Sequence, residues 1–372
     1  MKISTQKPEL QTALQKLSKA TPARSTLPIL SSVLFQVDDN ETTLRTTDLE
    51  ITILLKLAAS IERPGTICMP LQTLLSLTSE MPEDARITIS AKDDNKIEIK
   101  TEIGSYDIVG KPAEEFPAIP EIDNRNSIVL DGSNLSELIK KTSFAVSRDE
   151  LKPALSGVLF RFEKDNTTAV ATDGHRLVKS IKKDAGTAGF NGDIIIPRKF
   201  LSLVSNFLPT TDKAQIWVGE NHMTMAFGQD VYYTRIIGER FPDYDGVIPK
   251  DNDKELTINR ESILSAVRRV SVFSNRSTQQ IALILTDGKI RITTEDPEKA
   301  SKGKEEIEGK YKGEDLTIGY NAAYLKDILS HLPSEEITIK LKTAISAALF
   351  FPEKQEKNAN LTMLLMPIRL ND

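Results

Sequence analysis

Apolar residues along the chain recur with two different periods. Near the N-terminus Leu10, Leu14 and Leu17 fall three or four residues apart, which predicts a helix with one apolar face. Residues 33–45 alternate around a short polar turn and are rich in β-branched types, which predicts an antiparallel hairpin. A second helix is expected to begin at Pro70, and more alternating strands follow it. The order helix, strands, helix, strands predicts an α+β fold with antiparallel sheet.

This pattern occurs three times. A shift of 125 residues places residues 28–48 over residues 153–173, and ten of the twenty-one aligned residues are identical. Residues 281–295 form a weaker third copy of the same stretch. A period this long indicates tandem domains, because solenoid repeats run only ~20–50 residues.

The boundaries of the three copies follow from the period and from polar linkers. We expect domains at residues 1–125, 126–252 and 253–372, with linkers near residues 121–127 and 249–254. The highly charged stretch at residues 295–309 is expected to be a solvated loop within the third copy.

Composition is that of a globular protein, with 39% hydrophobic and 27% charged residues. The formal net charge of −5 means that a nucleic-acid partner would need basic residues gathered on one surface. Cys68 is the only cysteine, so neither an intramolecular disulfide nor a cysteine-based zinc site can form, and a reducing cytoplasm is expected. The N-terminus has no apolar signal region, and no apolar run approaches the ~20 residues of a membrane helix.

Residues suited to catalysis are sparse. The three histidines lie in different contexts and none has metal-ligand spacing, and no phosphate-binding glycine motif is present, so we expect no metal and no cofactor. Asp173 and His175 could form an acid–base pair, but Asp173-Gly174 is also an ordinary turn, which is the favoured interpretation. The segment Gly174–Leu177 differs from its counterparts in the other copies, which indicates a binding surface specific to the second copy.

Basic residues lie late in the first helix of all three copies. The helix dipole alone would explain each pair, yet three helices arranged about an axis could present one positive lining. At the C-terminus, Pro367 should interrupt strand pairing, and the apolar residues after it could form the lip of a groove.

Three tandem copies, the segment ATDGHRL at residues 171–177, Phe241-Pro242 and the terminal MPIRL resemble the bacterial sliding clamp, the beta subunit of DNA polymerase III. The resemblance covers the whole chain. It implies that each domain has two helices packed on antiparallel sheets, and that two chains close head to tail into a six-domain ring around duplex DNA. A groove between the second and third domains would bind short peptide motifs of the polymerase III catalytic subunit, the clamp loader, other polymerases and repair proteins.

The resemblance also implies functional residues. The peptide pocket would comprise Leu155, Thr172, Gly174, His175, Arg176, Leu177, Pro242, Val247, Leu364, Met366, Pro367, Ile368, Arg369 and Leu370. DNA would contact Arg24, Arg148, Lys152, Arg198 and Lys199. The seam between chains would pair Val272 and Phe273 with Tyr106 and Ile108 of the other chain. Pro153-Ala154 stands where some members carry aromatic residues, so the DNA contact of that loop departs from the family pattern.

Helix dimensions favour two chains in such a ring. Two inner helices per copy, each about 10 Å wide, would give one chain a circumference of roughly 60 Å and a hole only about 19 Å across. Two chains double the hole to roughly 38 Å, which clears a hydrated duplex. The resemblance implies a processivity factor without an active site, and the alternative is a DNA-modifying enzyme that uses Asp173 and His175.

Overall fold

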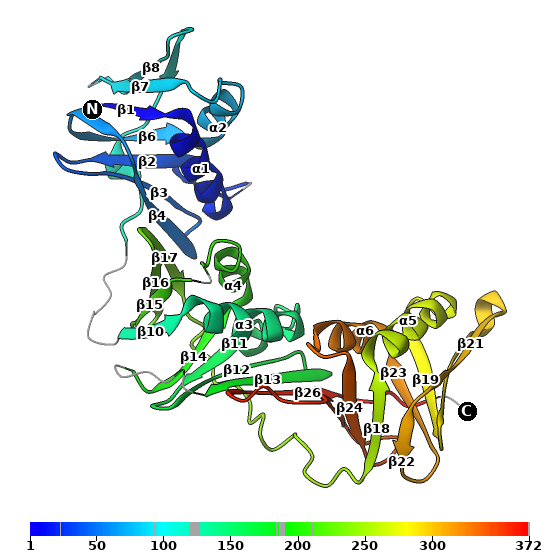
Figure 1. Cartoon of the computed structure of the whole chain (residues 1–372). Helices are drawn as coiled ribbons and strands as arrows, with labels where there is room; N and C mark the ends of the chain where they lie inside the picture. Colours follow the sequence, from blue (N-terminus) through cyan, green and yellow to red (C-terminus); the bar gives the residue numbers. More distant parts are fainter. Residues whose placement is uncertain are drawn as a thin grey trace. The chain divides into compact units, whose positions relative to one another are not determined.

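Two compact units make up the chain shown in Figure 1. The computed structural model describes residues 1–22, 24–92, 94–119, 127–183, 185, 190–209 and 211–370. Unit 1 contains residues 1–133 and 202–236, and unit 2 contains residues 134–201 and 237–372. The expected boundary between residues 125 and 126 lies outside the described residues.

Unit 1 contains two antiparallel sheets. The five-stranded sheet has the order β5 (Ser60–Arg63), β1 (Lys2–Gln6), β7 (Arg86–Ala91), β8 (Lys96–Lys100) and β9 (Ser105–Val109). The eight-stranded sheet has the order β10 (Ser127–Asp131), β15 (Lys213–Val218), β16 (His222–Phe227), β17 (Asp230–Arg235), β4 (Ile51–Leu57), β3 (Thr42–Thr47), β2 (Ser32–Val37) and β6 (Gly65–Pro70).

Two helices of unit 1, α1 (Lys7–Leu17) and α2 (Leu71–Ser79), pack against each other. Short 3₁₀ turns follow α1 and flank the strands, namely η1 (Ser18–Ala20), η2 (Pro28–Ser31) and η3 (Ala113–Glu115). Leu10, Leu14 and Leu17 of α1 are almost completely buried, which confirms the apolar face expected from their spacing.

Unit 2 repeats this arrangement. Its nine-stranded sheet has the order β14 (Gly192–Pro197), β11 (Gly157–Phe162), β12 (Asn166–Thr172), β13 (Arg176–Lys183), β26 (Ala359–Leu365), β25 (Ala348–Pro352), β24 (Glu336–Leu341), β18 (Lys254–Asn259) and β22 (Lys310–Lys312). Its four-stranded sheet has the order β21 (Ser301–Glu308), β20 (Lys289–Asp296), β19 (Gln280–Thr286) and β23 (Leu316–Asn321).

The helices of the third copy, α5 (Arg260–Val270) and α6 (Ala322–His331), lie side by side (Figure 1). Those of the second copy, α3 (Gly132–Thr142) and α4 (Arg198–Val204), each span the division between the two units. The remaining 3₁₀ turns are η4 (Ser143–Ala145), η5 (Pro153–Leu155), η6 (Ser271–Phe273) and η7 (Pro297–Lys299). Two helices per copy against antiparallel sheets confirm the predicted α+β class.

One pairing joins successive copies in both units. The fourth strand of the first copy, β4, pairs with the last strand of the second copy, β17, with Leu54 opposite Val231. Likewise β13 of the second copy pairs with β26 of the third, with Lys179 opposite Thr362. The corresponding strands that remain, β21 and β9, each lie at the edge of their sheet.

Two local expectations were wrong. Residues 295–309 are not a loop, because β20 and β21 form a hairpin closed by η7. The charged sequence concealed β21 because an edge strand exposes alternate side chains without needing apolar ones. The second helices begin one residue later than expected, since Pro70 is the N-cap of α2 and the last residue of β6.

A cluster of charges links the second copy to the third within unit 2. Lys141 of α3 and Lys182 of β13 both form ion pairs with Glu137, and both side chains are about nine-tenths buried. Glu356, which precedes β26, lies 3.2 Å from Lys182 and 3.6 Å from Lys141. Burial alone would raise the pKa of Glu137, but the hydrogen bonds from the two lysines outweigh it and lower the pKa.

We expect Glu137→Gln to lower the free energy of unfolding by about 1–3 kcal/mol, because two buried ammonium groups lose their main partner. A carboxylate with a lowered folded-state pKa stabilises the fold above its unfolded pKa of about 4.3, and this contribution disappears as the pH falls through the folded pKa. Urea denaturation across pH 3–7 measures the difference between variant and parent, which should shrink at the acid end.

The exposed Glu353 provides a matched control. Glu353→Gln removes the same charge from the surface and should leave the free energy of unfolding within ~0.5 kcal/mol of the parent value. Equal midpoints for both variants and the parent at pH 7 would show that the Glu137 cluster does not stabilise unit 2.

Candidate functional site

The turn between β12 and β13 is built by its own side chains. Thr172 Oγ1 donates to the carbonyl of Arg176 at 2.7 Å and accepts from the Gly174 N–H at 3.1 Å. Asp173 Oδ1 accepts from the N–H groups of His175 and Arg176 at 2.9 and 3.0 Å. These contacts support the interpretation of Asp173 as a turn-forming residue and not as a catalytic acid. Its described contacts reach the His175 backbone, whereas the His175 ring stacks on Tyr324 at 5.5 Å.

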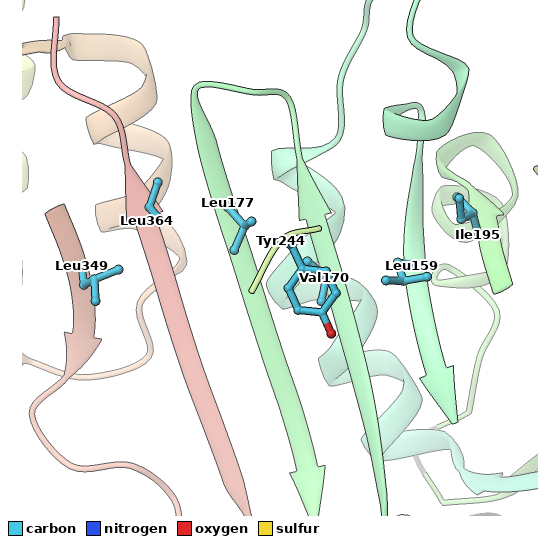
Figure 2. Close-up of a cluster of buried hydrophobic side chains, with 7 residues drawn as sticks. All are labelled: Leu159, Val170, Leu177, Ile195, Tyr244, Leu349 and Leu364. Carbon is cyan, nitrogen blue, oxygen red and sulfur yellow. The ribbon is translucent and has the colours of Figure 1, made fainter. Parts of the chain in front are cut away.

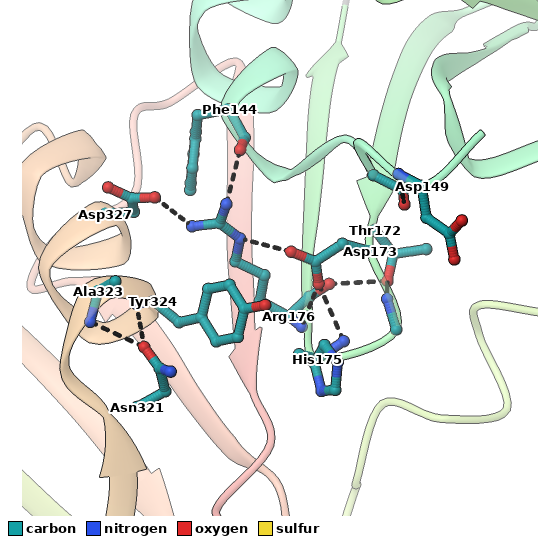
Figure 3. Close-up of polar contacts among 12 residues, drawn as sticks. Phe144, Asp149, Thr172, Asp173, His175, Arg176, Asn321, Ala323, Tyr324 and Asp327 are labelled. Carbon is teal, nitrogen blue, oxygen red and sulfur yellow. Dashed lines mark hydrogen bonds and ion pairs between the residues drawn. The ribbon is translucent and has the colours of Figure 1, made fainter. Parts of the chain in front are cut away.

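Arg176 connects this turn to two other elements (Figure 3). Its Nε donates to Asp173 Oδ2 at 3.1 Å, Nη1 to Asp327 Oδ2 of α6 at 2.6 Å, and Nη2 to the carbonyl of Phe144 in η4 at 2.9 Å. The guanidinium also lies over the rings of Phe144 and Tyr324. The side chain is buried, and its Nε, Nη1 and Nη2 atoms all donate to protein acceptors, so Arg176 positions the turn.

The C-terminal segment is anchored at two points. The Met366 N–H donates to the carbonyl of His175 at 2.8 Å, and the Ile368 N–H donates to the carbonyl of Gly319 at 2.9 Å. A Cβ on Gly319 would lie 2.6 Å from Leu370 Cδ2 and 2.7 Å from the Ile368 carbonyl, so only glycine allows this approach. Strand β26 ends at Leu365, which confirms the expected interruption before Pro367.

A cluster of buried apolar side chains lies on the nine-stranded sheet (Figure 2). Leu177 of β13 and Leu364 of β26 face each other in register, and Tyr244 packs with them from the segment between β17 and β18. The cluster comprises Leu159, Val170, Leu177, Ile195, Tyr244, Leu349 and Leu364. Two apolar side chains close in sequence to members of this cluster are exposed. Met366 is 42% exposed and Val247 is 58% exposed.

The structure thus brings together half of the expected peptide pocket by direct contact. Contacts of the turn and of the two paired strands join Thr172, Gly174, His175, Arg176, Leu177, Leu364 and Met366, whereas Ile368 is bonded to Gly319. Pro367, Arg369 and Leu370 belong to the same C-terminal segment, and Pro242 and Val247 flank Tyr244 along the chain. Leu155 ends η5, and its carbonyl accepts from the Ser147 N–H at 2.9 Å.

A cavity of about 620 Å³ adjoins the turn. Three expected DNA contacts, Arg148, Lys152 and Arg198, line it together with His175 and Arg176. Lys152 lies 3.8 Å from Asp149, whereas no described residue forms an ion pair with Arg148 or Arg198. Of the other two expected contacts, Lys199 follows Arg198 on α4, and Arg24 lies in unit 1 after η1.

The expected seam residues are surface groups on separate elements. Val272 and Phe273 lie in η6 and are 77% and 45% exposed. Tyr106 and Ile108 lie on the edge strand β9, where Tyr106 is exposed and Ile108 is half-buried.

The partners of Arg176 were missed from the sequence. Phe144, Tyr324 and Asp327 belong to helices of two different copies, and Asp327 is 151 residues away from Arg176. No periodicity links such positions. One weak signal was available, since Asn321 before an apolar stripe predicts the helix that holds Tyr324, and Asn321 does cap α6.

Among the described residues, no group of three or more His, Cys, Asp or Glu side chains could hold a metal ion. No helix in the described part of the chain is long and apolar enough to cross a membrane.

Comparisons with known proteins agree over the whole chain. Family models for the N-terminal, central and C-terminal domains of the DNA polymerase III beta subunit match residues 1–120, 129–243 and 245–369. The beta sliding clamp of Pseudomonas putida is 30% identical over 373 residues, and that of Chlamydia muridarum is 26% identical over 372 residues, with 100% of both chains covered in each case.

Solved structures give the same result. The sliding clamp of Pseudomonas aeruginosa bound to griselimycin has a TM-score of 0.93 at 28% identity, and that of Bacillus subtilis has a TM-score of 0.94 at 25% identity. Both comparisons cover 100% of each chain. The chain therefore belongs to the DNA polymerase III beta subunit family of bacterial sliding clamps.

Proposed function

We propose that two copies of this chain close into a six-domain ring around duplex DNA in the cytoplasm, with domains at residues 1–125, 126–252 and 253–372. Family membership gives the sliding-clamp function itself, that of a non-catalytic processivity subunit of DNA polymerase. The alternative of a DNA-modifying enzyme gains no support from the comparisons. Through the groove around Leu177 and Met366 the ring tethers the polymerase III catalytic subunit, the clamp loader, other polymerases and repair proteins.

The observation that best supports the ring is the repeated pairing between copies. Within each chain the fourth strand of one copy pairs with the last strand of the next, as β4 with β17 and β13 with β26. Among the described strands, β21, the fourth strand of the third copy, and β9, the last strand of the first copy, would then lack this partner, and both lie at sheet edges. Pairing β21 with β9 of the partner subunit continues the rule and removes two exposed edges.

The internal registers also define the register of this seam. In the third and fourth strands of the first and third copies, Arg45 pairs with Leu54 and Thr293 with Lys304, so Lys304 corresponds to Leu54. In the last two strands of the second and first copies, Ala226 pairs with Val231 and Lys100 with Ser105, so Ser105 corresponds to Val231. Carrying over the pair Leu54 and Val231 places Lys304 opposite Ser105 of the partner subunit.

One residue along, Gly303 lies opposite Tyr106 of the partner subunit. A Cβ on Gly303 would lie 3.0 Å from the Phe273 ring, so the ring covers this position of β21. The arrangement supports the expected contact between Phe273 and Tyr106 of the partner subunit.

The ring itself is tested by topology. On nicked circular DNA the loaded protein should remain bound, and linearising the same DNA should release it, because a closed ring leaves only at an end. Equal release from circular and linear DNA would contradict the proposed function.

We expect the chain to be a dimer at micromolar concentration and the double variant Val272→Ala, Phe273→Ala to shift it toward monomer. Burying each side chain at a seam contributes about 1.5–3 kcal/mol, most of which truncation removes. Sedimentation equilibrium measures the shift. Ile345→Ala, which truncates another exposed apolar residue, is the control and should leave the dimer unchanged. A monomeric parent protein would contradict the ring.

Replacing Arg24 and Lys152 together by Glu should reduce loading onto primed circular DNA while dimerisation stays intact. These side chains offer charge to phosphates and not to base edges, so direct binding should be weak, salt-sensitive and independent of sequence. Gel filtration measures how much protein stays bound to the loaded circles. Lys354→Glu, on an exposed turn, is the charge-reversal control and should load like the parent. A clear preference for one duplex sequence at fixed salt would oppose this assignment.

Removing residues 368–372 should abolish binding of a short peptide resembling Gln-Leu-x-Leu-Phe, because three expected pocket residues and the contact of Ile368 with Gly319, one of the two anchors of the C-terminal segment, are lost. The parent protein should bind such a peptide at about micromolar Kd, roughly −8 kcal/mol. Fluorescence anisotropy with a labelled peptide measures both. Removing only residues 371–372 is the matched control, and equal binding by the two truncations would withdraw the pocket assignment.

A further inference from the structure

The third copy contains a second basic cavity, of about 350 Å³, at the end of η6 and the start of α6. Its polar lining consists of Ser271, Ser274, Arg276, Gln279 and Lys326, and none of the described lining residues is acidic. The cavity near the turn at residues 172–176 differs in this respect, because aspartates contribute to its lining.

The two cations of this cavity are available to a ligand. Lys326 Nζ donates to Ser271 Oγ at 3.3 Å, and among the described residues neither Lys326 nor Arg276 forms an ion pair. The Arg276 side chain is exposed. Two positive charges beside hydroxyl and amide groups, without a carboxylate to neutralise them, favour an anion with several acceptor oxygens.

The loop that holds Arg276 is fixed by hydrogen bonds. Asn275 Oδ1 accepts from the Ser277 N–H at 2.9 Å, and the Asn275 carbonyl accepts from the Gln279 N–H at 2.8 Å. Gln279 takes the left-handed conformation with φ of 47°, and its carbonyl accepts from the Ala322 N–H at 2.8 Å. The loop is therefore tied to the start of α6, and a ligand would not have to order it.

The position of Arg276 repeats that of Arg148 in the second copy. Helix α5 and η6 lie 128 residues after α3 and η4, and Arg276 follows Arg148 at the same offset. In the first copy Arg24 lies in the corresponding loop after η1. The sequence alone selected the first two loops and passed over the third.

We propose that Arg276 and Lys326 bind a backbone phosphate of the encircled duplex, as the third copy's counterpart of the contacts at Arg24 and Arg148. This inference rests on the proposed ring. A phosphodiester fits the cavity better than a peptide, because the lining offers charge, hydroxyls and an amide but few apolar anchors.

The test is equilibrium binding of the full-length protein to a labelled duplex, measured against chloride concentration. Arg276→Ala and Lys326→Ala should each weaken binding and reduce the slope of log K against log salt by about 0.9, the value for one phosphate contact. Arg276→Lys should keep the parent slope because it keeps the charge. Lys354→Ala, on an exposed turn of the same copy, is the control and should match the parent.

Three outcomes would overturn the inference. An Arg276→Ala slope equal to that of the parent, with a reduced slope for Arg148→Ala, would exclude Arg276 and leave the ring intact. Weaker dimerisation of Arg276→Ala in sedimentation would assign the residue to the seam, which adjoins the cavity at Val272. If inorganic phosphate at constant ionic strength raises the melting temperature of the parent but not of Arg276→Ala, while DNA binding is unchanged, the cavity binds free phosphate.

A different measurement tests the proposed function itself. A parent protein that leaves nicked circles as fast as linear DNA would remove the ring, whatever the slopes of the variants show.

Discussion

Main-chain pairing between strands of successive copies is the constraint on which the rest of the structure depends. A single copy would leave its fourth strand and its last strand with unpaired N–H and C=O groups along a sheet edge. Pairing β4 with β17 and β13 with β26 satisfies them and joins the copies into sheets of eight and nine strands. For this reason the compact units do not follow the sequence repeats, and the second copy contributes strands to both.

The sequence was informative where local pattern and repetition were sufficient. The spacing of Leu10, Leu14 and Leu17 predicted α1, and the matched copies predicted the architecture. Strand β21 was missed because its alternate residues face solvent and its charges hide the period of two. The anchoring of Ile368 on Gly319 was missed because it joins residues that are distant in the chain, and no local rule connects them.

Comparison of the first and second copies separates the fold from the candidate function in the turn at residues 172–176. In the first copy Thr47 Oγ1 accepts from the Leu49 N–H and donates to the Ile51 carbonyl, and Asp48 Oδ1 accepts from the Ile51 N–H. Thr172 and Asp173 repeat these bonds, so this pair forms the turn in both copies.

The two turns differ at Gly174 and Arg176, which stand where the first copy has Leu49 and Ile51. The turn takes the left-handed conformation in both copies, with φ of 76° at Leu49 and 91° at the matching Gly174, and glycine adopts it without strain. No atom lies within 4 Å of a Cβ built on Gly174, and the missing side chain therefore leaves the surface open. Arg176 replaces Ile51 and introduces the contacts to Asp327 and Phe144.

A buried arginine between two aspartates is a weak source of net stability, because desolvation offsets much of the attraction between the charges. Its effect here is on position. Arg176 fixes the turn against η4 and α6, and the turn presents the His175 carbonyl that holds the Met366 N–H. The turn and the start of the C-terminal segment are consequently held in place by the protein itself. A peptide bound as proposed would have to order its own chain but not this part of the protein, which would lower the entropic cost of binding.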